Sequence, residues 1–184
     1  MNPDNPEKAS SSLSTLVSVM NSNEQFFKVL AKVDQGSVEE LISKGADING
    51  LTNLGESVWA FVVPSGPDAV RLALGLGANP NSIDGQGNSS LYSAIYSDDP
   101  EIARILIEHG AKISSNLESD RFNLLHTAAL AGKASVLAVL IAAAPPSLLR
   151  EENIFGRTPF GEAVAAKQDD CIRLLRAIEP TCQL

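Results

Sequence analysis

With 184 residues, of which 44% are hydrophobic and 20% charged, the chain is long enough for one well-buried domain or a short repeat array. Its formal net charge of −8 argues against binding to a nucleic-acid backbone, and no apolar run approaches the roughly 18 residues that a membrane-spanning helix needs. Only 5% of the residues are aromatic, while Ala, Leu, Val and Ile are plentiful, which favours closely packed helices over a β-sandwich.

The N-terminal residues are rich in Pro, Asn and Ser, and we expect disorder up to about residue 12. They lack the basic start and apolar stretch of a secretory signal, so we expect a cytoplasmic protein, or a periplasmic or secreted one if a signal has been removed. Apolar residues then follow at helical spacing, namely Leu13, Leu16, Val17 and Met20. This pattern predicts a short capping helix within an N-terminal tail of residues 1–23.

A repeated phrase organises the rest of the chain. Gly-Ala-Asp-Ile-Asn begins at Gly45, Gly-Ala-Asn-Pro-Asn at Gly77 and Gly-Ala-Lys-Ile-Ser at Gly110, so the spacings are 32 and 33 residues. Each phrase follows an apolar stretch with helical spacing. Because glycine tolerates the left-handed conformation that closes a helix, each phrase predicts the end of a helix.

A second phrase lies between these and predicts the start of another helix. In it, a turn that contains glycine leads into an apolar helix capped by Ser or Thr. At the starts of the longer helices, Pro67 and Pro100 stand where a missing N–H costs least, and Ser37 with Glu40 fits a capping box. We therefore expect helix pairs at about 24–45, 56–77, 89–110, 124–144 and 158–179. Extra residues near 115–120 and 143–149 predict longer loops there.

These residues resemble the ankyrin-repeat family, whose unit of about 33 residues has a Thr-Pro-Leu-His helix start and a Gly-Ala-Asp-x-Asn end. The resemblance implies an all-α solenoid of stacked helix-turn-helix units with β-turn tips, in about five repeats of which the terminal ones are degenerate. It covers a repeat domain at residues 24–179 and leaves a C-terminal tail at 180–184. The chain departs from the family pattern at Trp59, where Leu is usual, and at Tyr92 and Gly161, where His is usual. The fourth unit ends in Ala-Ala-Pro-Pro instead of Gly-Ala.

No residue pattern in the chain predicts catalysis. His126 stands at the helix-start position, where the resemblance implies that the imidazole fixes the turn through backbone hydrogen bonds. His109 lies at a helix end, where a cation complements the helix dipole. The glycines of Gly50–Gly55 mimic a phosphate-binding frame, but Glu56 occupies the lysine position. We therefore expect no enzyme activity and no catalytic, cofactor-binding or metal-binding residue.

The two cysteines, Cys171 and Cys182, have no histidine near them in the sequence, which argues against a metal site. We expect two free thiols, with a disulfide as the alternative.

The function that the resemblance implies is recognition of another protein. In ankyrin arrays, the turn tips and the exposed side of each first helix form a continuous concave face. Large apolar residues at such positions are typical of interaction hot spots. The expected tip contacts are Leu51, Asn53, Leu54, Ile83, Gln86, Asp120, Phe122, Ile154, Phe155 and Arg157. The expected first-helix positions that face the groove are Phe61, Ser65, Tyr96, Leu130 and Glu162.

We therefore expect a small non-catalytic binder that regulates or inhibits a partner protein, for example by occluding an enzyme. An adaptor that bridges two proteins is the alternative, and an enzyme with an unrecognised site is the alternative from another class. We expect the free chain to be a monomer that neither binds nucleic acid nor inserts into a membrane. Compact repeats with short turns suit a bacterial protein.

Overall fold

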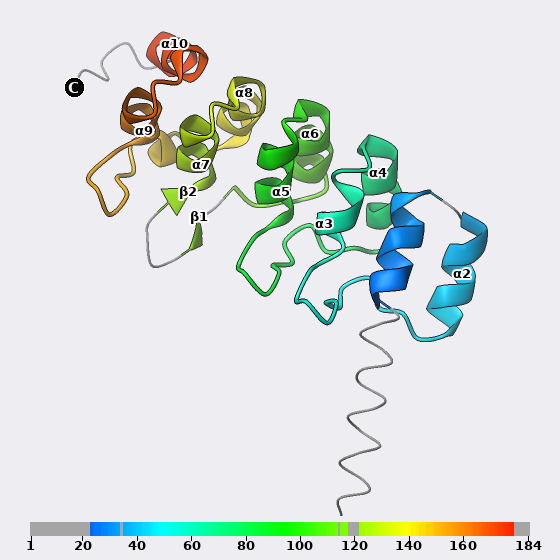
Figure 1. The fold of residues 1–184 in the computed structure, drawn as a ribbon. Coiled ribbons are helices and arrows are strands. Elements are labelled where there is room, and N and C mark those ends of the chain that lie inside the picture. The colour runs from blue at the N-terminus through cyan, green and yellow to red at the C-terminus, as the bar shows by residue number, and fades with distance from the viewer. Residues whose placement is uncertain (1–22, 34, 114, 118–121, 179–184) are drawn as a thin grey trace, which may run out of the picture. The chain divides into compact units, whose positions relative to one another are not determined.

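The computed structural model describes residues 23–33, 35–113, 115–117 and 122–178 (Figure 1). The helices among these residues come in five pairs. The chain divides into two compact units, which are described separately below. Unit 1 comprises Met1–Asn79 with Asp84–Gln86, and unit 2 comprises Pro80–Ile83 with Gly87–Leu184.

Unit 1 contains the first two helix pairs. The helix of residues 23–31 precedes α2 (Gln35–Ser43), and α3 (Trp59–Val62) precedes α4 (Pro67–Gly75). Its largest fully buried side chains are Trp59, Phe26, Phe27 and Leu30. Two large rings from the first helix therefore share the core of this unit with the indole of the second pair.

Unit 2 contains the other three pairs. They are α5 (Ser90–Ser97) with α6 (Pro100–Glu108), α7 (Leu124–Leu130) with α8 (Ala134–Ala143), and α9 (Pro159–Ala165) with α10 (Asp169–Ile178). Figure 1 shows α6, α8 and α10 in one row, which we call the outer row, and α5, α7 and α9 in another, the inner row. The largest fully buried side chains are Leu91, Ile95, Ile102, Leu106, Leu124, Leu125, Leu137 and Leu140. The core of unit 2 therefore lies between the two rows.

Both segments predicted as longer loops contain a short regular element. β1 (Ser115–Leu117) pairs antiparallel with β2 (Phe122–Asn123), and these are the strands of a two-stranded sheet. After α8, a 3-10 helix, η1 (Pro146–Leu149), buries Leu149. Ala144 is extended, as expected for a residue before proline, so α8 ends there.

Helix starts follow the predicted capping chemistry at three places. Ser89 Oγ accepts the N–H of Tyr92 at 3.3 Å at the start of α5, and Asp99 and Thr158 cap α6 and α9 through their side chains. The helix start predicted from Ser37 is wrong. α2 already begins at Gln35, so Ser37 lies inside the helix, and the residue before Gln35 lies outside the described part.

Helix ends at the three Gly-Ala phrases are confirmed. Gly45, Gly77 and Gly110 have φ angles of 89°, 89° and 87°, a left-handed conformation that side chains with a Cβ avoid. In each case the N–H of the next alanine donates to a carbonyl five residues back, at 2.9 to 3.1 Å. Each phrase thus closes one helix and satisfies a carbonyl group that the helix leaves unpaired.

Asparagine side chains join consecutive repeats. Asn81 Nδ2 donates to the carbonyl of Gly110 at 2.8 Å, and Asn81 Oδ1 accepts the N–H of Lys112 at 2.8 Å. Asn49 makes the same two bonds with the repeat that follows it, at 3.1 and 2.7 Å. The last residue of the Gly-Ala-x-x-Asn phrase therefore links its own repeat to the next.

The Asn81 link gives a first testable prediction. Asn81→Ala removes a donor and an acceptor from backbone partners, and because the site is exposed we expect the free energy of unfolding to fall by about 1 kcal/mol. Asn81→Asp keeps the acceptor and should lose about half as much. Urea denaturation followed by far-UV circular dichroism measures both values. Asn53→Ala, at an exposed position, is the matched control, and equal losses for Asn53→Ala and Asn81→Ala would contradict the link.

The predicted tails fall largely outside the described residues. The capping helix expected around Leu13 to Met20 and the C-terminal tail of residues 180–184 both lie there. The boundaries of the repeat domain at 24–179 stay a prediction.

Candidate protein-binding surface

The turn before α9 is held by one buried asparagine. Asn153 Oδ1 accepts the N–H groups of Phe155 at 2.9 Å and Arg157 at 3.2 Å. Asn153 Nδ2 donates to Glu162 Oε1 at 2.6 Å, and the Asn153 N–H donates to the Arg157 carbonyl at 3.0 Å. Asn153 and Glu162 are only 4% and 3% exposed. These bonds fix the turn in one conformation without using the side chain of Phe155.

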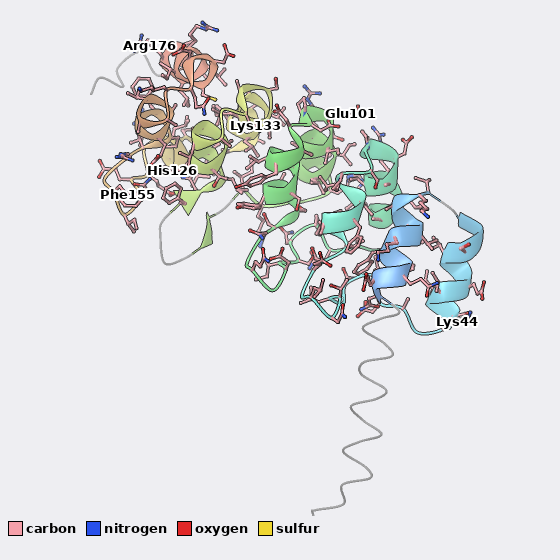
Figure 2. The ribbon with its side chains drawn as sticks, in the orientation of Figure 1. Lys44, Glu101, His126, Lys133, Phe155 and Arg176 are labelled. Carbon is pink, nitrogen blue, oxygen red and sulfur yellow. The ribbon has the colours of Figure 1, made fainter. Side chains whose placement is uncertain are left out.

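An apolar cluster with one cation sits on this turn, and we call it the tip cluster; it comprises Phe122, Ile154, Phe155 and Arg157. Phe155 lies on this turn and is 64% exposed (Figure 2). Its ring meets the half-buried Phe122 ring edge-on at 6.3 Å between centroids. The guanidinium carbon of Arg157 lies 5.7 Å from the centroid of Phe155, and Arg157 Nη1 is 3.6 Å from Glu162 Oε1. The structure thus brings four of the predicted contact residues together, although they come from two repeats.

His126 connects α7 to the same turn. Its Nδ1 accepts the N–H of Asn123 at 3.3 Å, and its Nε2 lies 2.9 Å from the carbonyl oxygen of Arg157. A carbonyl only accepts, so Nε2 carries the proton and the ring is neutral. The Phe122 ring lies 5.5 Å from the imidazole. The predicted structural role of His126, backbone bonding that fixes the turn, is confirmed.

The protonation of His126 gives a second prediction. Burial lowers the pKa of the imidazole below the ordinary histidine value, although the carbonyl of Arg157 and the charges of Glu151 and Glu162 act in the opposite direction. The unfolded chain therefore binds the proton first as the pH falls. The stabilising contribution is complete above the ordinary pKa of about 6.5 and is lost as the pH falls from there to the folded-state pKa.

His126→Gln isolates this effect, because glutamine can still donate to Arg157 but does not titrate. Between about pH 7.5 and about pH 5.5, the wild type should lose more unfolding free energy than His126→Gln. Urea denaturation at each pH supplies the comparison. Equal losses in the two proteins would show that His126 does not carry the pH dependence.

Three further predicted residues of unit 2, namely Tyr96, Leu130 and Ile83, are exposed. Tyr96 on α5 is 61% exposed, and its hydroxyl accepts a hydrogen bond from Tyr92 at 3.2 Å. Leu130 at the end of α7 is 44% exposed, and its carbonyl accepts from Gln168 Nε2 at 3.2 Å. Ile83 is 60% exposed. Their exposure matches the expectation, and their role in binding stays a prediction.

Unit 1 carries the predicted tip residues Leu51, Asn53, Leu54 and Gln86. Leu54 is 73% exposed, whereas Leu51 is half-buried and its carbonyl accepts from Asn23 Nδ2 at 3.2 Å. Asn53 and Gln86 are exposed. The two turns meet where the Gly85 N–H donates to the Gly55 carbonyl at 2.7 Å. Leu54 is therefore the large exposed apolar side chain on this pair of turns.

Two predicted first-helix positions are less exposed than expected. Glu162 does not face a groove: Asn153 binds its carboxylate under the turn, so that expectation is wrong. Phe61 is half-buried because the ring of Phe27, from the helix of residues 23–31, packs 5.6 Å from it. Ser65 is exposed and donates to the Phe61 carbonyl at 2.9 Å. Asp120 lies outside the described residues.

Sequence reasoning missed a second surface, an open groove of about 410 Å³ in the outer row. We call it the α6/α8 groove. Its α6 wall is formed by Arg104, Ile107 and Glu108, and its α8 wall by Ser135, Ala138, Val139, Ala142 and Ala143. A signal for it exists in the sequence, since no charged residue occurs between Lys133 and Arg150.

His109 and Cys171 have structural settings within the fold. His109 Nδ1 lies 2.7 Å from the Ile105 carbonyl oxygen at the end of α6. Cys171 is a free, buried thiol, and burial, with Asp170 and Asp98 adding to it, raises its pKa to about 11, so it stays protonated near neutral pH. Cys182 lies outside the described residues.

Neither a metal-binding cluster nor a membrane-spanning helix occurs in the part of the chain that the structure describes. There, no group of three or more His, Cys, Asp and Glu side chains could hold a metal ion. None of the helices described is long and apolar enough to span a bilayer.

Paired helices, glycine-closed ends and asparagine links between repeats define a protein built from stacked helix-turn-helix units. The family model for ankyrin repeats, in three copies, matches residues 19–117, which is more than half of the chain. The chain belongs to the ankyrin-repeat family, and the predicted all-α solenoid fold is confirmed. Ankyrin repeats are generic protein–protein interaction modules and are typically non-catalytic. Comparison with curated proteins finds no match.

Proposed function

We propose that the chain is a non-catalytic binder that regulates or inhibits a partner protein, and that unit 2 docks this partner on the tip cluster. The observation that supports this most is the state of Phe155. Its side chain is 64% exposed, while its backbone N–H is tied to a buried asparagine.

The fold itself does not require an aromatic side chain at this place. Asn153 holds the turn through main-chain groups of Phe155 and Arg157, which any residue other than proline could supply. An exposed Phe155 beside a 55% exposed Ile154 leaves apolar area in water, which a bound partner would cover. The alternative is that these side chains are unrelated surface residues without a binding role. It fits poorly with the Phe155 ring, which contacts both the Phe122 ring and the Arg157 guanidinium.

The side chains of the tip cluster are also preorganised for binding. The side chain of Phe155 is confined by the Phe122 ring on one side and by Arg157 on another. Arg157 is itself tied by its backbone to Asn153 and His126. Because little freedom is left to lose, docking onto these residues costs little ordering entropy. Aromatic and arginine side chains in such settings dominate binding energy at protein interfaces.

The tip cluster supplies a third prediction. Phe155→Ala should weaken binding of the partner about 30-fold, because it removes the central exposed ring of a hot spot. Partners are first isolated by affinity capture from the source organism with mass spectrometry, and their affinity is then measured by calorimetry. If the partner is an enzyme, its activity should fall with added wild-type chain and not with Phe155→Ala at the same concentration.

Ile42→Ala is the matched control, because Ile42 is 45% exposed on α2, which belongs to the other unit. It should retain the partner with unchanged affinity. Circular dichroism must show the same helical signal in both variants. Partners retained equally by Phe155→Ala and Ile42→Ala would exclude the tip cluster as the docking site.

A further inference from the structure

The outer face of α8 is apolar where its neighbours are charged. α8 contains no charged residue, whereas α6 and α10 of the same row carry Glu and Arg or Asp and Arg on their exposed sides. A helix that is apolar all round is typical of a buried helix. Yet Ser135, Ala138 and Ala142 are exposed in the folded chain. The sequence of α8 is thus typical of a helix that is buried on both sides. In the folded chain, only one side of α8 is buried.

The α6/α8 groove lies along this face and is shaped for close contact with another helix. Small side chains line its α8 wall at helical spacing, which lets a second helix axis approach to roughly 8 Å. Ile107 and Val139 are half-buried in the groove and can pack against an apolar partner. The groove belongs wholly to unit 2 and lies in the outer row, away from the turn that carries Phe155 (Figure 2).

Two charges on one rim indicate what the occupant is. Arg104 and Glu108 lie four residues apart on the exposed side of α6, and both line the groove. Within the part of the chain that the structure describes, neither side chain forms a hydrogen bond or an ion pair with a neighbouring side chain. Arginine before glutamate is also the less favourable order for a pair within one helix. Both charges are therefore available to a partner.

We propose that this face binds a second copy of the chain in an antiparallel two-fold arrangement. α8 packs on the partner's α8, while Arg104 faces the partner's Glu108 and Glu108 faces the partner's Arg104. Because the two copies are related by a two-fold axis, the opposite charges on the rim of each copy form two complementary ion pairs. The same contact buries the apolar α8 faces of both copies. This arrangement replaces the monomer expected from the sequence. The dimer carries two tip clusters, so each copy keeps its own docking site.

Sedimentation velocity of the full chain over a range of concentrations tests the association. The wild type should pass from monomer to dimer as concentration rises. Ala138→Glu and Ala142→Arg place opposite charges at exposed helix positions, so both should fold, and each should weaken the dimer more than about tenfold. Ala60→Glu makes the same kind of change at an exposed position of α3 and should leave the association unchanged. Phe155→Ala should also leave it unchanged.

The charge pairs are tested by exchange. Arg104→Glu and Glu108→Arg should each weaken the dimer about tenfold, because each places like charges opposite one another. The double variant Arg104→Glu/Glu108→Arg should recover the wild-type dissociation constant within about threefold. A wild type that stays monomeric at its highest workable concentration overturns the proposal. So does a dimer that tolerates Ala138→Glu, or a double variant that shows no recovery.

Discussion

Asn123→Ala is expected to lower the free energy of unfolding by about 3 kcal/mol, which is a large fraction of the stability of a small protein. Asn123 is fully buried and stands where β2 meets α7. Its Oδ1 accepts the N–H groups of Leu125 at 3.0 Å and His126 at 3.1 Å. Its Nδ2 donates to the Leu148 carbonyl at 2.9 Å and to Glu151 Oε2 at 3.1 Å.

Two costs add up when this side chain is removed. Loss of the helix cap leaves donors at the start of α7 unpaired and costs about 1 kcal/mol. Loss of the two donors removes the bonds to Leu148 in η1 and to Glu151 after it, at a buried position, and costs about 2 kcal/mol more. The segment between α8 and α9 therefore depends on a residue that precedes α7.

Two variants separate these costs. Asn123→Ser keeps an acceptor for the cap and loses the donors, so about 2 kcal/mol should be lost. Asn123→Asp also keeps the cap but sets a carboxylate against Glu151 and the Leu148 carbonyl, so it should be no better than alanine. Urea denaturation with far-UV circular dichroism measures all of them, with Asn53→Ala as the exposed control. A loss for Asn123→Ala no larger than that of Asn53→Ala would refute this account.

The regular parts of the fold could be predicted because their signals are local. A left-handed glycine after an apolar stretch and a cap before one depend on a few neighbouring residues, and both recur with the repeat. Gly45, Gly77 and Gly110 therefore marked helix ends correctly. The same logic failed at Ser37, where the helix begins earlier than the capping pattern indicates.

The irregular parts could not be predicted because they depend on contacts between distant residues. The η1 segment is held by Asn123, which lies 25 residues before Leu148 in the chain. A pattern that relies on a fixed repeat gives no information where the repeat is interrupted. The strand pair and η1 both occur at such interruptions.

The exposure of the candidate binding residues could be predicted at the turn tips, but less well on the first helix of each repeat. Leu54, Ile154 and Phe155 are exposed as expected, since turn residues project from the fold whatever their neighbours are. The side of a first helix is covered or exposed according to the adjoining segments. Glu162 is buried by a turn that precedes its own helix, and Phe61 is covered by the repeat before it.

Trp59→Ala is expected to have the largest effect on unit 1, a loss of about 4 kcal/mol. Trp59 stands where the family usually has leucine, and its indole is fully buried. Removing it leaves a cavity in the core of unit 1. It also deprives the Asn79 carbonyl of the indole N–H, which donates to it at 3.1 Å. Asn79 is bound from its other side by Asn49 Oδ1, so the indole completes the link between repeats.

Two further substitutions of Trp59 separate the contribution of side-chain size from that of the indole hydrogen bond. Trp59→Phe keeps a ring and loses the donor, so about 1 to 2 kcal/mol should be lost. Trp59→Leu restores the usual residue of the family but leaves part of the cavity, because leucine fills less of this fully buried space than an indole does, so about 3 kcal/mol should be lost. Circular dichroism in urea is the measurement, since the chain has a single tryptophan. Full stability in Trp59→Leu would mean that the indole contributes no packing of its own, and that the core of unit 1 adapts to a smaller side chain.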